Sequence, residues 1–214
     1  MPKSYSSTRY NPKHIQDIID IVDYTIAKHK RVAVFRFDVH FPYIDQDDPR
    51  IYRVTEFTKK FLGSLKAKLE HQAKLEHQPK QKRRYKNAVN FDYLWCKEHR
   101  VEKGTTMPHY HFAIILNGND FYSWGNFAYQ ELCLKTFLEE AYMSAMDLNE
   151  EQAKGKLQFC KVKNICTYAG KNYDKNREDT IDMLAYLAKL EGKLPGQRCW
   201  GKSNLQALCL FRIF

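Results

Sequence analysis

The stretch from Arg31 to Phe41 constrains the fold most, because apolar and polar side chains alternate along it until Pro42 ends the pattern. The apolar side of this predicted strand consists of Ala33, Phe35, Phe37, Val39 and Phe41, and the other side consists of Val34, Arg36, Asp38 and His40. The pattern therefore predicts one face that packs into a core and one face that carries ionisable groups.

The remaining patterns alternate between helical and strand periodicity. A first helix is predicted to end near His29, and further helices to cover about 53–78, 127–146 and 178–191. Strands are predicted to cover 91–100, 109–116 and 157–168. The second helix contains two consecutive copies of one hexapeptide, at 67–72 and 73–78. We interpret this repeat as a local duplication. This order predicts an α+β fold with a central antiparallel sheet of about five strands flanked by helices. The predicted domain covers 31–203, between a helical extension at 1–30 and an apolar tail at 204–214.

The charge balance points to a polyanionic partner. The formal net charge is +10, and no apolar stretch is long enough to cross a bilayer, which favours nucleic acid over membrane. A run with Lys82, Arg83 and Arg84 is the densest positive cluster, and it is either a DNA contact or a solvated linker. Six isolated cysteines and the absence of an apolar leader predict a reduced, cytoplasmic protein.

Two histidines are placed for metal binding. His109 and His111 share one face of a strand, with backbones about 7 Å apart, which allows both imidazoles to reach one ion. The pair alone also occurs on solvated strands, but Glu98 lies on the adjacent strand of the same hairpin. Two imidazoles and a carboxylate leave coordination positions open, so we expect Mg²⁺ or Mn²⁺ acting on a phosphate.

The motif Tyr-x-x-Lys, which can supply a tyrosine nucleophile, occurs three times. Pro12 interrupts the first copy and Gly170 the second, whereas Tyr186 and Lys189 lie inside a predicted helix. On that helix Asp182, Tyr186, Lys189 and Lys193 are expected on one side, where Lys189 would ease formation of the phenolate or contact the phosphate. Taken alone, the pattern equally fits a core tyrosine beside a solvated lysine.

The order of these motifs resembles the HUH endonuclease superfamily of rolling-circle replication initiators and relaxases. The matching segments are the hydrophobic strand 34–39, Glu98 followed by Pro108-His109-Tyr110-His111-Phe112, and Tyr186-Leu187-Ala188-Lys189. Within the superfamily the chain is most similar to YagK/YfjJ-like proteins, also called the inovirus gene 2 protein type, including the close Trp200-Gly201-Lys202-Ser203. The hairpin after Glu98 is longer than in compact viral initiators, which leaves Glu102 as an alternative third ligand.

The resemblance implies transesterification on single-stranded or hairpin DNA. Tyr186 would form a 5′-phosphotyrosine link and leave a 3′-hydroxyl that primes replication of a phage, satellite or plasmid-like element, with DNA contacts from Arg36, Lys193 and the basic cluster. No Walker A motif is present, so a helicase and a polymerase would come from the host. The alternatives are a relaxase or transposase using the same chemistry, and a non-catalytic DNA-binding regulator. The intact His109, His111 and Tyr186 argue against the regulator.

Overall fold

The computed structural model describes residues 5–42, 48, 50–75, 90–102, 105–125, 133–170, 172–194 and 196–205, apart from the side chains of 51, 73–75, 100–102 and 105–107. The elements in these ranges are α1 (Pro12–His29), β1 (Arg31–Val39), α2 (Ile51–Thr55), α3 (Phe57–Leu75), β2 (Asp92–Glu102), β3 (Thr105–Asn117), α5 (Leu134–Met146), α6 (Glu150–Ala153), β4 (Leu157–Phe159), β5 (Lys163–Cys166), α7 (Asn172–Ala185), the 3-10 turn η1 (Tyr186–Ala188) and β6 (Trp200–Lys202). No helix among them is long and apolar enough to cross a membrane.

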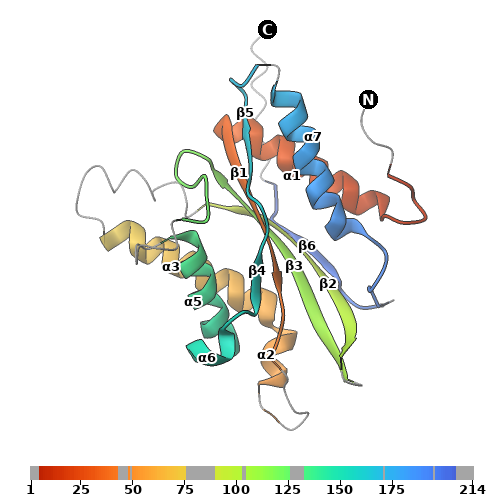
Figure 1. Ribbon diagram of the computed structural model, residues 1–214, viewed down its shortest axis with the longest axis vertical. Helices are drawn as coiled ribbons and strands as arrows, with labels where there is room; N and C mark the ends of the chain where they lie inside the picture. Colours follow the sequence, from red (N-terminus) through yellow and green to blue (C-terminus); the bar gives the residue numbers. More distant parts are fainter. Residues whose placement is uncertain are drawn as a thin grey trace.

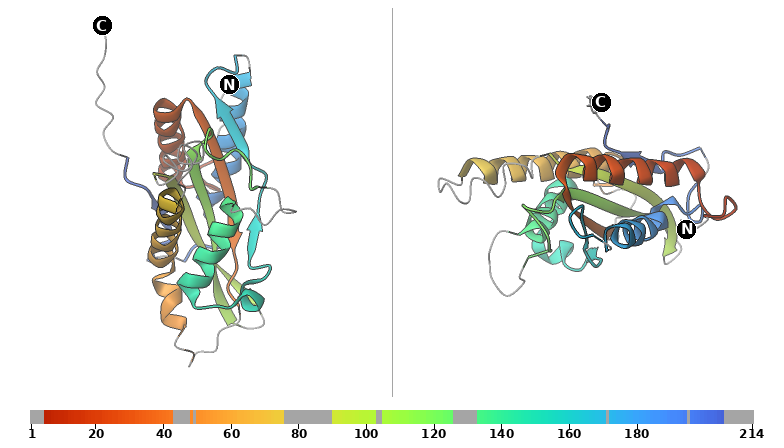
Figure 2. Two further views of the ribbon diagram at one scale, coloured as in Figure 1. Left: turned by 90° about the vertical axis from the view of Figure 1, so that its left-hand side faces the viewer. Right: turned by 90° about the horizontal axis from the view of Figure 1, so that it is seen from above.

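The strands form one six-stranded antiparallel sheet, which confirms the α+β prediction (Figure 1). Their order is β4-β1-β3-β2-β6, and β5 also pairs with β1. The strands run along the long axis of the molecule (Figure 2, left). β2 and β3 form a long hairpin that pairs from Asp92 with Ile115 to Glu102 with Thr105. The central position of β3 places the two histidines between β1 and β2.

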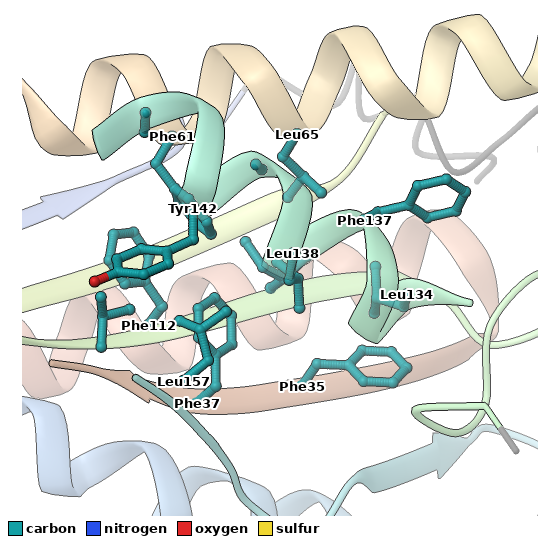
Figure 3. Close-up of a cluster of buried hydrophobic side chains, with 14 of the residues drawn as sticks. Phe35, Phe37, Phe61, Leu65, Phe112, Leu134, Phe137, Leu138, Tyr142 and Leu157 are labelled. Atoms are coloured by element: carbon teal, nitrogen blue, oxygen red, sulfur yellow. The ribbon is translucent and has the colours of Figure 1, made fainter. Parts of the chain in front are cut away.

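One face of the sheet is covered by α3 and α5. The predicted apolar side of β1 packs here, with Phe35 and Phe37 fully buried beside Phe112 of β3. The helices contribute Phe61 and Leu65 from α3 and Leu134, Leu138 and Tyr142 from α5 (Figure 3). Stacked aromatic rings such as Phe37 and Phe112, with centroids 5.5 Å apart, fill this core with large apolar side chains.

The opposite face is covered over only part of its length. Val32 and Val34 of β1 pack with Ile115 of β3 under α1 and α7, which contribute residues such as Ile18 and Leu184. Figure 1 shows these two helices on the side of the sheet away from α3 and α5. Further along β1 the same face carries Arg36, Asp38 and His40, so the end of α7 meets ionisable groups instead of a core.

The predicted strand 157–168 is divided into β4 and β5. Phe159 pairs with Phe37, but Lys163 pairs with Val34, so three residues of this segment lie opposite two of β1. The extra residue makes a bulge at 160–162, where Cys160 N–H still donates to Arg36 O at 3.0 Å. Bulges increase local twist, and this one lies beside Arg36 at the boundary between the apolar and ionisable parts of the face.

The segment Trp200-Gly201-Lys202-Ser203 ties the sheet edge to α1 and β2. Trp200 Nε1 donates to Asp17 Oδ2 at 3.0 Å, and Lys202 forms an ion pair with the same carboxylate at 2.9 Å. A Cβ on Gly201 would lie 2.3 Å from the Trp95 ring, so only glycine fits this contact. The motif therefore has a structural explanation that needs no DNA.

His14 of α1 makes folding stability depend on pH. Its ring stacks on Trp200 with centroids 4.1 Å apart, and burial together with Lys193 lowers the pKa of His14 to about 4. The unfolded chain therefore takes up this proton first as the pH falls from about 6.5 to about 4, and the folded state loses stability across that window. We expect His14→Phe, which keeps a stacking ring, to show a smaller fall in Tm between pH 7 and pH 4.5 than the wild type. Equal falls in thermal denaturation scans would contradict this assignment.

Candidate metal and nucleophile site

The candidate metal ligands gather where three neighbouring strands meet on the partly covered face. Asp38 of β1 lies opposite His111 of β3, and Glu98 of β2 lies opposite His109. His111 is fully buried, while His109 and Glu98 are 4% and 7% exposed. Tyr110, between the histidines, points to the other face and is buried in the core below α3, as the strand alternation predicts. The sheet therefore brings the predicted ligands together in a largely water-excluded position.

His111 lies between two carboxylates. Its Nδ1 is 2.6 Å from Asp38 Oδ1, and its Nε2 is 3.1 Å from Glu98 Oε2. Burial disfavours a charged imidazole, but the hydrogen bonds and charges of Asp38 and Glu98 outweigh it and hold the pKa of His111 above its ordinary value. For both carboxyls burial acts to raise the pKa, and His111 more than offsets it, so both pKa values lie low. Two carboxylates therefore flank one buried imidazole, an arrangement that favours positive charge between them, which a divalent cation can supply.

The two distances from His111 distinguish the roles of the carboxylates. Ligands in adjacent positions of an octahedral ion are about 3.0 Å apart, because each metal–ligand bond is near 2.1 Å. The separation between Glu98 Oε2 and His111 Nε2 fits this spacing, whereas the 2.6 Å contact of Asp38 is a short hydrogen bond to Nδ1. Asp38, His109 and His111 also offer ligand atoms within 4.8 Å of one another. We favour Asp38 as the orienting partner, since a histidine ligand commonly donates its second N–H to a carboxylate.

A third histidine extends the cluster along β1. His40 Nδ1 lies 3.2 Å from His109 Nδ1, with ring centroids 4.1 Å apart. Asp38 lies on β1 and His40 directly follows its last residue, and each faces the Nδ1 atom of one predicted ligand histidine. With Nδ1 facing Asp38, His111 has its Nε2 beside Glu98 Oε2, the contact expected of two neighbouring metal ligands.

The predicted nucleophile is held against this cluster. The Tyr186 ring meets the His111 ring edge-on with centroids 5.0 Å apart. Arg36 Cζ lies 4.3 Å and Lys189 Nζ lies 4.0 Å from the centre of the same ring. Arg36 also pairs with Asp38 at 3.3 Å, which links the tyrosine to the partner of His111. The ring of Tyr186 is therefore held between two cationic side chains and the histidine–carboxylate cluster.

The prediction that Tyr186 and Lys189 lie on a continuous helix is wrong. α7 ends at Ala185, Tyr186 begins a 3-10 turn, and Lys189 is extended with φ −55° and ψ 143°. Asp182, on the last turn of α7, accepts a hydrogen bond from Tyr5 Oη at 2.5 Å. The turn, not the helix face, therefore brings tyrosine and lysine together.

Lys193 lies inside the site. Its side chain is 7% exposed, its Nζ is 4.0 Å from Glu98 Oε1, and it donates to the carbonyl of Lys189. A DNA contact by Lys193 remains a prediction, but its visible role is to connect the Tyr186 turn to the predicted carboxylate ligand. Gly192 lies close beside Glu98, since a Cβ there would be 3.3 Å from Glu98 Cβ. Its φ of +74° is also a conformation that favours glycine.

Some sequence predictions concern parts that the structure does not describe. Lys82, Arg83 and Arg84 fall outside the described residues, as does the tail beyond 205. The backbone of Glu102 lies at the end of β2, but its side chain is not described, so it stays an alternative ligand. Asp38 and His40 were missed as site residues, although the polar side of the β1 alternation contained the signal for both.

Comparison with known proteins gives one match. A family model described as the YagK/YfjJ C-terminal domain matches residues 3–203. This range runs from the segment before α1 to the end of β6, and it therefore includes all of the cluster residues. No curated protein and no solved structure matches the chain.

Proposed function

The chain belongs to the YagK/YfjJ C-terminal domain family, and we propose that it nicks and rejoins DNA with Tyr186 as nucleophile and a divalent metal as cofactor. The observation that carries this proposal is the meeting of two kinds of group from distant segments. A tyrosine at the end of α7 contacts a buried histidine of β3, which is itself bracketed by carboxylates.

The residues fit a divalent cation such as Mg²⁺ or Mn²⁺. His109, His111 and Glu98 would hold the ion, and Asp38 would fix the orientation of His111 through Nδ1. When bound, the ion polarises the scissile phosphate and stabilises the charge that develops on it. A mixed nitrogen and oxygen donor set leaves positions for phosphate oxygens, which a closed structural site would lack.

The chemistry balances with groups of the protein and the DNA alone. Tyr186 Oη attacks the phosphorus and loses its proton, a phosphorus–tyrosine bond forms, and the bond to the 3′ oxygen breaks as that oxygen takes up a proton. Lys189 and Arg36 lie over the tyrosine ring, where they stabilise a phenolate both as nucleophile and as leaving group. Because the phosphotyrosine ester conserves the bond energy, attack by a 3′-hydroxyl rejoins the strand.

Arg36 is also placed to bind the scissile phosphate. Its Nε is buried and has no hydrogen-bond partner among the described residues, while its Nη2 already pairs with Asp38. A guanidinium presents several donors in a fixed plane, so one side can hold Asp38 while another contacts phosphate. This supports the DNA-contact role predicted for Arg36.

The biological role that we propose is initiation of rolling-circle-type replication of a phage, satellite or plasmid-like element. The net charge of +10 favours a DNA partner, and single-stranded or hairpin DNA lets a phosphate enter a site recessed against a sheet. A relaxase or transposase would use the same site. The DNA that the protein recognises distinguishes these roles, not the chemistry.

The test is formation of a covalent adduct. The 214-residue chain is incubated with 5′- or 3′-labelled single-stranded oligonucleotides from hairpins near its gene, with Mn²⁺, Mg²⁺ or EDTA. We expect a band that survives denaturation, depends on the metal and carries the label downstream of the nick, together with a free 3′-hydroxyl fragment. Tight DNA binding with no adduct under either metal would support the non-catalytic regulator instead.

A further inference from the structure

The turn that carries Tyr186 is paired with a segment from the other end of the chain. Residues 5–11, here called the N-terminal strap, run antiparallel to residues 188–190. Leu190 N–H donates to Arg9 O at 3.0 Å, and Asn11 N–H donates to Ala188 O at 2.9 Å. Between these bonds Tyr10 forms a β-bridge with Lys189. The strap is therefore hydrogen-bonded to the backbone of residues 188–190, which closely follow the predicted nucleophile Tyr186.

A side-chain contact adds a second attachment. Tyr5 Oη donates to Asp182 Oδ1 on the last turn of α7, and the Tyr5 ring packs edge-on against Tyr10 with centroids 5.4 Å apart. Burial, together with the hydrogen bond and charge of Asp182, raises the pKa of Tyr5 well above its ordinary value. Tyr5 thus remains a hydrogen-bond donor throughout the physiological pH range.

The local sequence by itself does not stop α7 at Ala185. Tyr186 to Glu191 contains no glycine or proline and includes the strong helix formers leucine, alanine and lysine. In a continuing α-helix Leu190 N–H would donate to Tyr186 O, and Ala188 O would accept from residue 192. The strap occupies both of these groups, on Leu190 and on Ala188.

We propose that the N-terminal strap ends α7 and thereby positions Tyr186 against the metal cluster. Its catalytic consequence rests on the proposed nicking function; its structural consequence does not. Without the strap, residues 186–190 continue the helix, and the Tyr186 ring turns away from His111. The strap is a positioning segment, because none of its described atoms is placed at the metal cluster itself.

The first test removes residues 1–10 and keeps Asn11, the N-cap of α1. We expect the rate of adduct formation to fall about 10²-fold, because a small displacement of a nucleophile is costly. The loss should fall on kcat, with KM for the oligonucleotide and the affinity for Mn²⁺ little changed. A wild-type rate in the shortened chain overturns the proposal, and so does a parallel loss of Mn²⁺ binding, which would indicate general destabilisation.

A rescue variant separates positioning from stability. Leu190→Pro in the shortened chain removes the N–H that would extend the helix, and proline favours the extended conformation that Lys189 already has. We expect it to recover at least about tenfold of the lost rate. Leu190→Ala is the matched control, because it trims the same half-exposed side chain but still permits a helix. Equal rates for the two variants would contradict the proposal.

Two outcomes need separate treatment. If the shortened chain does not fold, Tyr5→Phe in the 214-residue chain tests the strap instead, because it loses the bond to Asp182. It should show a smaller fall in kcat at unchanged Mn²⁺ affinity, and an unchanged kcat overturns the proposal. If the wild type forms no adduct, the nicking function fails and the strap is judged from a crystal structure of the shortened chain. There α7 continuing past Ala185 supports it, and an unchanged 3-10 turn overturns it.

Discussion

Tyr186→Phe is expected to abolish the covalent adduct, with the rate falling roughly 10³-fold or more. The substitution removes the attacking oxygen but leaves the ring that contacts His111, Arg36 and Lys189. Binding of Mn²⁺ and of the oligonucleotide should therefore stay close to wild type. Denaturing gels measure the adduct, and calorimetry and filter binding measure the two affinities.

The chain supplies a matched control for this substitution. Tyr168 also begins a Tyr-x-x-Lys motif, but its side chain is 75% exposed in the turn after β5. Tyr168→Phe should leave adduct formation unchanged. If Tyr186→Phe still forms the adduct, the nucleophile is another residue, and loss in Tyr168→Phe instead would identify it.

Glu98→Gln is expected to weaken Mn²⁺ binding by more than about 100-fold and to remove nicking, because it takes a charged ligand from the predicted metal set. Asp38→Asn should cost less, about tenfold, because asparagine keeps an oxygen that accepts from His111 Nδ1. Isothermal titration with Mn²⁺ at one fixed pH compares the three proteins, and circular dichroism checks that each is folded.

The reverse order of affinities would change the assignment. A larger loss in Asp38→Asn than in Glu98→Gln would make Asp38 the direct ligand, as its closeness to both histidines permits. Glu102→Gln belongs in the same series, since a loss confined to that variant would place the third ligand at the end of the hairpin. Unchanged affinity in all three variants would remove the metal site from the proposed function.

The sheet could be predicted because its strands carry simple periodic patterns. The alternation of β1 showed which residues enter the core, and Phe35 and Phe37 are fully buried there. The pattern could not show that 157–168 divides at a bulge, because the break arises from pairing with β1, a strand more than a hundred residues earlier. Local sequence carries no trace of such a register shift.

The site was predicted in part for the same reason. His109, His111 and Glu98 belong to one hairpin, so their proximity follows from local pairing. Asp38 and His40 join them only because β1 pairs with β3, and this pairing could not be predicted from the sequence. The helix end before Tyr186 was missed because the strap that causes it lies at the other end of the chain.

The long-range pairing of β1 also sets when the site can exist during folding. Val39 pairs with Tyr110 to bring β1 to the cluster, whereas the segment after Tyr186 is held by the hydrogen bond from Leu190 N–H to Arg9 O, which closes a much longer loop. A growing chain on the ribosome can therefore pair β1, β2 and β3 around the cluster well before α7 and Tyr186 have emerged. Under the proposed function, cleavage of DNA therefore has to wait until the chain has been made at least as far as Tyr186.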